Sequence, residues 1–120
     1  NKACPAGWHL PATEEWSEIH HHVEGDWAYQ SKSTTGWSND GNGNNNTGLN
    51  IFPAGYRLAS GNLSESAGFI SQGEKAYFWS SSASHSAGKS RYQHFYHNSD
   101  ASSSTGDKLN GLSVRCEKDL

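Results

Sequence analysis

The two cysteines of this chain, Cys4 and Cys116, stand near its opposite ends, and it has no others. If they pair, the bond closes almost the whole chain into one loop and brings its first and last segments together. On the chain-entropy model, closing a loop of ~100 residues stabilises a fold by up to about 4.7 kcal/mol. An even cysteine count in a chain rich in glycine, serine and asparagine favours a disulfide formed in an oxidising compartment. Neither cysteine has the spacing of a metal or redox motif, so the alternative is two buried free thiols.

The composition predicts one domain, residues 1–120, with a small aromatic core. A chain of 120 residues can bury a single core, but only 32% of these residues are hydrophobic. Five Trp, five Tyr and four Phe compensate, since each aromatic ring buries about 150–250 Å². The charges are scattered and sum to −3, which argues against nucleic acid as a partner. No apolar run approaches the ~20 residues of a membrane span. The chain begins with Asn1 rather than Met, so we expect it to be the C-terminal part of a longer protein.

The clearest helix signal begins at Thr13. A hydroxyl residue suited to an N-cap is followed by two glutamates, which the helix dipole favours in the first turn. Trp16, Ile19 and Val23 then recur at helical spacing and predict one apolar face that packs on the core. The helix is expected to end near Gly25.

Several segments of the chain are typical of short strands. We predict strands at 8–10, 67–70, 76–80, 92–96 and 112–116, and two short strands or a strand and a bend over 49–58. Residues 27–37 are open between a second short helix and a loop, and residues 38–48 consist of turn formers. The expected fold is therefore α+β, with one or two helices on a twisted antiparallel sheet, long loops, and a disulfide that joins the terminal strands.

Four motifs, in order along the chain, resemble the Fibrobacter succinogenes major paralogous domain. They are Cys-Pro-Ala-Gly-Trp-His-Leu-Pro at 4–11, Phe-Pro-Ala-Gly-Tyr-Arg at 52–57, Phe-Trp-Ser-Ser at 78–81 and Ser-Val-Arg-Cys at 113–116. In the second motif, Phe52 replaces the leucine usual in the family. The resemblance implies a C-type-lectin-like fold on a secreted or surface-anchored bacterial protein. It implies the fold more than the activity, because one fold supports many functions.

The polar segment from 80 to 105 is the leading candidate for a binding surface. Its tyrosines and histidines offer large amphipathic contacts, and its serines and asparagines offer adaptable hydrogen bonds, which is the mixture that paratopes use. The alternative is a serine-rich solvated loop. C-type-lectin-like domains also carry the segments that diversity-generating retroelements vary, so we hypothesise that 80–105 is hypervariable. The expected ligand-binding residues are Ser82, Ser84, His85, Arg91, Gln93, His94, Tyr96, His97 and Asn98, with Trp37 and Asn39 adding an edge.

A weak calcium candidate lies in the loop at Asp40, Asn42 and Asn44, where oxygen ligands alternate. Asn45 stands where an EF-hand needs glycine, and Ile51 stands where it needs a bidentate glutamate. An asparagine- and glycine-rich turn is the default interpretation, so we predict no cofactor.

The sequence gives no positive sign of an enzyme. It lacks a Gly-x-Ser-x-Gly elbow, and both cysteines belong to the frame. We therefore expect an extracellular recognition module, an adhesin or receptor-binding domain, for a protein or glycan on another cell or surface. The main alternative is a structural terminal domain of a bacterial surface lipoprotein or pilus-like assembly; an enzyme on a lectin-like scaffold is a third.

Overall fold

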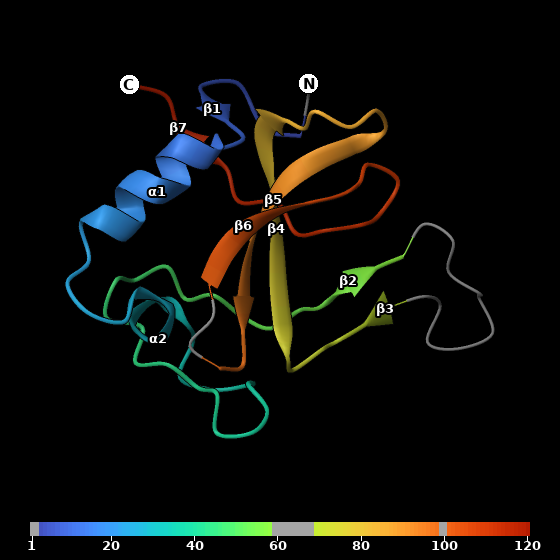
Figure 1. Ribbon diagram of the computed structural model, residues 1–120. Coiled ribbons are helices and arrows are strands. Elements are labelled where there is room, and N and C mark those ends of the chain that lie inside the picture. The colour runs from blue at the N-terminus through green and yellow to red at the C-terminus, as the bar shows by residue number, and fades with distance from the viewer. Residues whose placement is uncertain (1–2, 59–68, 99–100) are drawn as a thin grey trace.

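The computed structural model describes residues 3–58, 69–98 and 101–120 and has the predicted α+β class (Figure 1). Two helices accompany strands, and the strand pairs within the described ranges are antiparallel, although β4 also makes isolated parallel bridges to Gly55 and Ser113. The elements are β1 (Trp8–His9), α1 (Thr13–His21), α2 (Trp27–Ser31), β2 (Tyr56–Arg57), β3 (Phe69–Ile70), β4 (Lys75–Ala83), β5 (Lys89–Tyr96), β6 (Ala101–Asp107) and β7 (Glu117–Lys118).

The centre of the molecule is the twisted sheet of β4, β5 and β6, in that order. Figure 1 shows α1 and α2 on one side of this sheet and the β2–β3 hairpin extending from the other side. The hairpin is joined to β4 by a bridge between Gly55 and Ala76, where the Gly55 N–H donates to the Lys75 carbonyl at 2.8 Å. The described part of the polar 80–105 segment comprises the end of β4, the whole of β5 and most of β6.

Helix α1 begins where the sequence predicts, but its N-terminus is capped differently. The N-cap is Ala12, and the Thr13 N–H donates to the Ser82 hydroxyl of β4 at 2.9 Å. The Glu15 carboxylate accepts from the Ala12 N–H, also at 2.9 Å. A side chain from the sheet thus supplies the cap that Thr13 was expected to give, and it fixes the helix on β4. The helix ends at His21, earlier than the expected Gly25.

The second helix, left open by the sequence, is a short one that Asp26 caps. The Asp26 carboxylate accepts from the Tyr29 N–H at 2.9 Å, which satisfies one of the free donors of the first turn. Trp27 and Ala28 are buried. The helix therefore serves mainly to place the Trp27 ring in the core.

The core is a cluster of aromatic rings between the helices and one face of the main sheet. Phe95 of β5 is 0% exposed and contacts Trp27 at a centroid distance of 4.9 Å. Trp16 of α1 lies 5.7 Å from Phe78 and 6.4 Å from Phe95. Ile51 is the other large side chain that is fully buried. Aromatic rings thus supply the apolar area that the low hydrophobic content would otherwise lack.

The two ends of the chain are joined as predicted. Cys4 and Cys116 form a disulfide with a Cα–Cα distance of 5.8 Å. Beside it, Trp8 and His9 of β1 pair with Lys118 and Glu117 of β7. Figure 1 shows both termini at the same end of the molecule. The disulfide and the strand pair together close the frame.

Two strand predictions were wrong. Residues 112–116 form no strand, although Ser113 makes a single bridge to Phe78, and the terminal strand is Glu117–Lys118. The Ser113 N–H donates to the Tyr77 carbonyl, and the Ser113 carbonyl accepts from the Trp79 N–H. The segment therefore contacts β4 through one residue and does not pair along it. Strand β6 was missed, because its serines do not alternate with apolar residues. Of the predicted strand 67–70, residues 67 and 68 lie outside the described residues.

Across the described parts of the chain, neither helix has the length and apolar character needed to cross a membrane.

Candidate functional site

The main sheet presents two chemically different faces. On β5, Gln93 and Phe95 point toward the helices, while Tyr92, His94 and Tyr96 point the opposite way, as the alternation predicts. We call the second surface the tyrosine face. Its members are Tyr56 of β2, Tyr77 of β4, and Tyr92, His94 and Tyr96 of β5.

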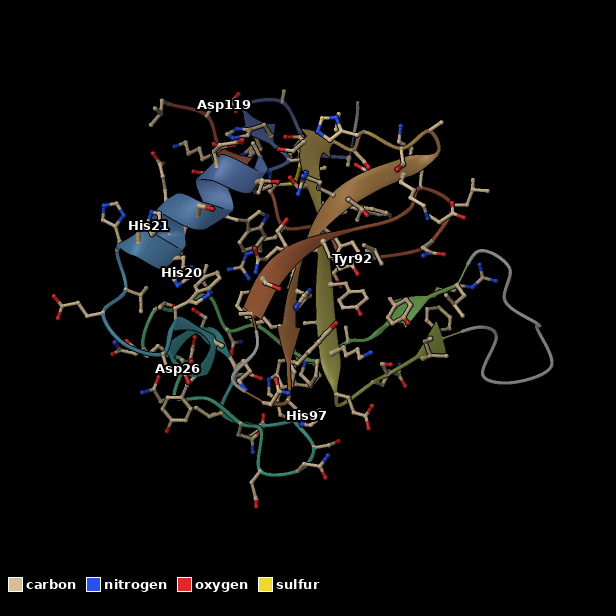
Figure 2. All side chains as sticks on the ribbon, in the orientation of Figure 1. His20, His21, Asp26, Tyr92, His97 and Asp119 are labelled. Atoms are coloured by element: carbon tan, nitrogen blue, oxygen red, sulfur yellow. A yellow bond between two sulfur atoms is a disulfide. The ribbon has the colours of Figure 1, made fainter. Side chains whose placement is uncertain are left out.

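The rings of the tyrosine face form two stacks that meet through tilted contacts. The Tyr77 ring lies 4.6 Å from Tyr56 on one side and 4.6 Å from Tyr92 on the other. The His94 ring stacks on Tyr96 at 4.3 Å. Figure 2 shows Tyr92 beside the middle of the sheet, on the side from which β2 and β3 extend. Such rings hold a fixed shape with few rotatable bonds.

Hydrogen bonds tie the polar tips of these rings together. The hydroxyl oxygens of Tyr77 and Tyr96 lie 3.2 Å apart. Burial, followed by the hydrogen bond to Tyr96, raises the pKa of the Tyr77 phenol far above its usual range. The Lys75 ammonium lies 5.1 Å from the centre of the Tyr96 ring, a cation–π distance. Tyr77 and His94 are buried, while Tyr56, Tyr92 and Tyr96 are half-buried and reach the surface.

Strand β6 adds exposed serines to this face. Ser102 pairs with His94 and Ser104 pairs with Tyr92 in the antiparallel register. The Ser102 hydroxyl lies 3.0 Å from His94 Nε2, and both serines are exposed. The face therefore combines rigid aromatic rings with adaptable hydroxyls, and no aspartate or glutamate belongs to this set.

Three of the expected ligand-binding residues are buried: Gln93 and Trp37 on the core side, and His94, which is 6% exposed, beneath the tyrosine face. Gln93 is only 5% exposed and lies on the core side of β5. Trp37 is 6% exposed, and its Nε1 donates to the Ile51 carbonyl at 3.1 Å. All three assignments need correction, because buried side chains offer almost no contact area to a partner, and His94 acts only as a support for the Tyr96 ring. Arg91 lies on the same side of β5 as Gln93 and is half-buried, so it is also separated from the tyrosine face.

Other expected residues are spread around the sheet. Ser82 caps α1, and the Ser84 hydroxyl accepts from the Ser86 N–H at 3.2 Å. His85 is exposed in the turn between β4 and β5. The sequence therefore grouped residues that the structure divides among the helix cap, a turn and both faces.

A buried lysine, Lys32, binds the backbone at the end of β5. Lys32 Nζ donates to the backbone carbonyls of Tyr96 and Asn98 at 3.1 and 3.0 Å. Burial lowers the pKa of the Lys32 ammonium. Gly41 packs so closely on the His97 carbonyl that a Cβ there would collide with it. The loop that carries exposed Asn39 thus lies against His97, beside the end of the tyrosine face.

The amide oxygens proposed for calcium have roles within their own loop. Asn42 Oδ1 accepts from the Trp37 N–H at 2.9 Å, and Asn44 Oδ1 accepts from the Asn46 N–H at 3.0 Å. Asn39 and Asp40 adopt left-handed φ values of 55° and 57°, which asparagine and aspartate tolerate better than most residues. These contacts are those of the asparagine-rich turn that was the default interpretation.

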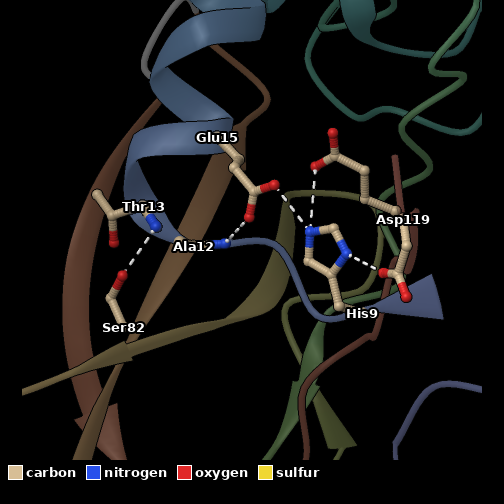
Figure 3. Close-up of polar contacts among 7 residues, drawn as sticks. His9, Ala12, Thr13, Glu15, Ser82 and Asp119 are labelled. Carbon is tan, nitrogen blue, oxygen red and sulfur yellow. Dashed lines mark hydrogen bonds and ion pairs between the residues drawn. The ribbon is translucent and has the colours of Figure 1, made fainter. Parts of the chain in front are cut away.

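A charged cluster lies at the terminal frame rather than near the tyrosine face (Figure 3). His9 Nε2 lies 2.8 Å from Glu15 Oε2, and His9 Nδ1 lies 2.7 Å from Asp119 Oδ1. The hydrogen bond to Glu15, followed by that to Asp119, raises the pKa of the His9 imidazole. The bond from the Ala12 N–H chiefly lowers the pKa of Glu15, while burial and then the Glu15 charge raise the pKa of Glu117.

Among the described residues, His9, Glu15 and Glu117 are the group whose ligand atoms lie close enough, within 4.8 Å, to hold a metal ion. Both nitrogens of His9 face carboxylates, which only accept hydrogen bonds. When it is doubly protonated, the form that these carboxylates favour, the imidazole donates to both and has no lone pair for a metal. The cluster is therefore best described as an ion-pair clasp between β1, α1 and the C-terminal segment.

Sequence reasoning missed Tyr56, Tyr77, Ser102 and Ser104. The alternation of Ala76, Tyr77 and Phe78 could have placed Tyr77 opposite the core, because Phe78 is the more apolar neighbour. The position of Tyr56 depends on its pairing with Ile70 and on bridges that its two neighbours make to Ala76 and Gly111, and nothing in the local sequence signals these distant contacts.

The geometry defines a disulfide-closed α+β domain whose main sheet presents a stacked aromatic face. The family model of the Fibrobacter succinogenes major domain matches residues 1–118, and the chain belongs to this family, which implies a bacterial origin. No curated protein and no solved structure matches the chain.

Proposed function

We propose that the domain is an extracellular recognition module and that it binds a protein or glycan through the tyrosine face. The observation that carries this proposal is the chemistry of that face. Tyr56, Tyr92 and Tyr96 are half-buried rings fixed by stacking, and exposed Ser102 and Ser104 flank them. A surface ordered before binding loses less conformational entropy when a partner docks.

The scaffold and location in this proposal follow from the frame and the family. A C-type-lectin-like arrangement accords with adjoining termini and long loops, and the Cys4–Cys116 disulfide accords with secretion or display on a bacterial surface. In this view the tyrosine face, within the 80–105 segment and around it, is the part that varies between related copies. Arg91, Gln93 and Trp37 stay outside the proposed surface.

Binding screens with matched variants test the proposal. The wild-type domain is applied to a glycan array and to an array of purified extracellular proteins, beside a Tyr92→Ala/Tyr96→Ala variant and a Tyr29→Ala control. Tyr29 is an exposed tyrosine on α2, away from the face. We expect signals on one array that the double variant loses and the control keeps. Signals that the double variant retains, with its fold verified by circular dichroism, would refute the assignment.

A further inference from the structure

A cavity lies on the side of the main sheet opposite the tyrosine face, between α1, α2 and β6. Its volume is about 220 Å³, and its lining includes Trp16, Trp27, Gln93 and Ser103 together with Ser17 and His20. Ser17 and His20 are exposed and form its rim, whereas Trp16 and Trp27 are 2% and 5% exposed and form its floor. Figure 2 shows His20 on the side of α1 that faces α2, where its ring stacks on Trp27 at 5.0 Å.

Among the described residues, three side-chain polar atoms that belong to residues of this lining are buried without a hydrogen-bond partner. They are Nε1 of Trp16, Nε1 of Trp27 and the hydroxyl oxygen of Ser103. Buried polar groups in folded proteins are nearly always paired, so each orphan needs an explanation. Three orphans that line one cavity have a common explanation if a polar group occupies it.

The chemistry of the lining restricts that occupant. Both indoles can only donate, so the occupant must present acceptor oxygen. None of the lining residues is an aspartate, glutamate, lysine or arginine, and a buried carboxylate without a cationic partner is costly. A neutral amide fits better, because its carbonyl accepts from the indoles and its N–H can donate to Ser103.

We propose that this cavity binds the acetamido group of an N-acetylated sugar. The acetamido carbonyl accepts from Trp16 and Trp27, and its N–H donates to the Ser103 hydroxyl. The sugar ring stays at the rim, where Ser17 and His20 supply polar contacts to its hydroxyls. Exposed side chains change rotamer within nanoseconds, so movement of the rim uncovers the floor without rearrangement of the sheet. The cavity shares Ser102 with the tyrosine face, but the Ser102 hydroxyl is bound to His94 and the other lining side chains lie on the opposite side of the sheet. The proposal does not depend on the function proposed for the tyrosine face.

The indole N–H signals of the five tryptophans give a direct test by nuclear magnetic resonance. Titration of the full chain with N-acetylglucosamine should shift the Trp16 and Trp27 signals in a saturable way. The Trp37 signal should stay fixed, because its Nε1 already donates to Ile51. Glucose, which lacks the amide, and acetate, which is charged, should leave all signals in place. An equal response to N-methylacetamide and to a short peptide would show that any amide suffices and would overturn the sugar assignment.

A pair of neighbouring variants completes the test. Ser103→Val fills the floor and removes the hydroxyl, and valine suits an edge strand. Thr105→Val removes a hydroxyl two residues along the same strand, at an exposed position outside the cavity lining and outside the tyrosine face. We expect about tenfold weaker sugar binding for Ser103→Val and no change for Thr105→Val. Absence of any shift in the wild type at millimolar sugar would show that water alone fills the cavity, and it would overturn the proposal.

Discussion

The two faces of the main sheet both carry aromatic rings, but the rings of one face form the core and several rings of the other reach the surface. On the core face, Phe78 and Phe95 pack against indoles and are sealed from water. On the tyrosine face, Tyr77 stacks on Tyr92 at 4.6 Å, and the Tyr77 hydroxyl is hydrogen-bonded to that of Tyr96. A phenylalanine ring is stabilised only by burial. A tyrosine ring can instead pack through its flat face while its hydroxyl stays in contact with water. The comparison separates the rings that hold the fold from those that remain available to a partner.

Removing one ring from each face should give the largest difference. Phe95→Ala leaves a cavity at the centre of the core and should lower the free energy of unfolding by about 3–5 kcal/mol. Tyr92→Ala removes a half-buried ring and should cost about 1–2 kcal/mol. Denaturant unfolding of both variants measures the two values. Equal losses would mean that the tyrosine face is also a structural core.

Opening the frame should weaken the fold without altering either face. The Cys4→Ser/Cys116→Ser double variant loses the constraint on the unfolded chain and should be less stable by about 2–4 kcal/mol. Thermal unfolding followed by circular dichroism measures the loss. Below the transition, the near-ultraviolet spectrum of the aromatic rings should stay native. An unchanged melting temperature would contradict a stabilising role for the disulfide.

The buried hydroxyl of Tyr77 predicts an alkaline effect that the core face cannot show. Its folded pKa lies above the unfolded value of about 10. The stability it contributes is therefore present below about pH 10 and is lost as pH rises through the folded pKa. Spectrophotometric titration should reveal a late-ionising tyrosine that Tyr77→Phe removes and Tyr29→Phe keeps. A titration without such a component would show that the face is open to solvent.

The smallest predicted effect belongs to the clasp of His9 with Glu15, Glu117 and Asp119. The raised pKa of His9 contributes stability below its unfolded value of about 6.5, and this is lost as pH rises through the folded pKa. The lowered pKa of Glu15 works the opposite way, since its contribution disappears on acidification. The melting temperature of His9→Gln should differ most from wild type in weak acid. Exposed His85→Gln serves as the control, and a pH-independent difference would refute the clasp.

Local patterns predicted much of the scaffold. Trp16 and Ile19 at helical spacing located α1, and the alternation around His94 assigned the two faces of β5. The cysteine count predicted the closure of the frame. In each case the signal lies within a few residues or in the chemistry of one residue type.

Long-range contacts decided what the sequence did not predict. Strand β6 is serine-rich and forms because β5 offers a backbone ladder to pair with. The segment 112–116 alternates like a strand, but only Ser113 meets β4. Trp37 and Gln93 belong to polar neighbourhoods in the sequence, yet the fold turns both inward. Serine-rich composition thus indicated a surface without indicating which face carries it.

The central claim, that the tyrosine face and not the whole 80–105 segment meets the partner, can be tested on two adjacent residues. Tyr92 and Arg91 are both half-buried on β5 and point to opposite sides. The Kd of the strongest array ligand is measured for Tyr92→Ala and Arg91→Ala. We expect Tyr92→Ala to weaken binding about tenfold or more and Arg91→Ala to leave the Kd nearly unchanged. Equal losses, or a larger loss for Arg91→Ala, would contradict this account.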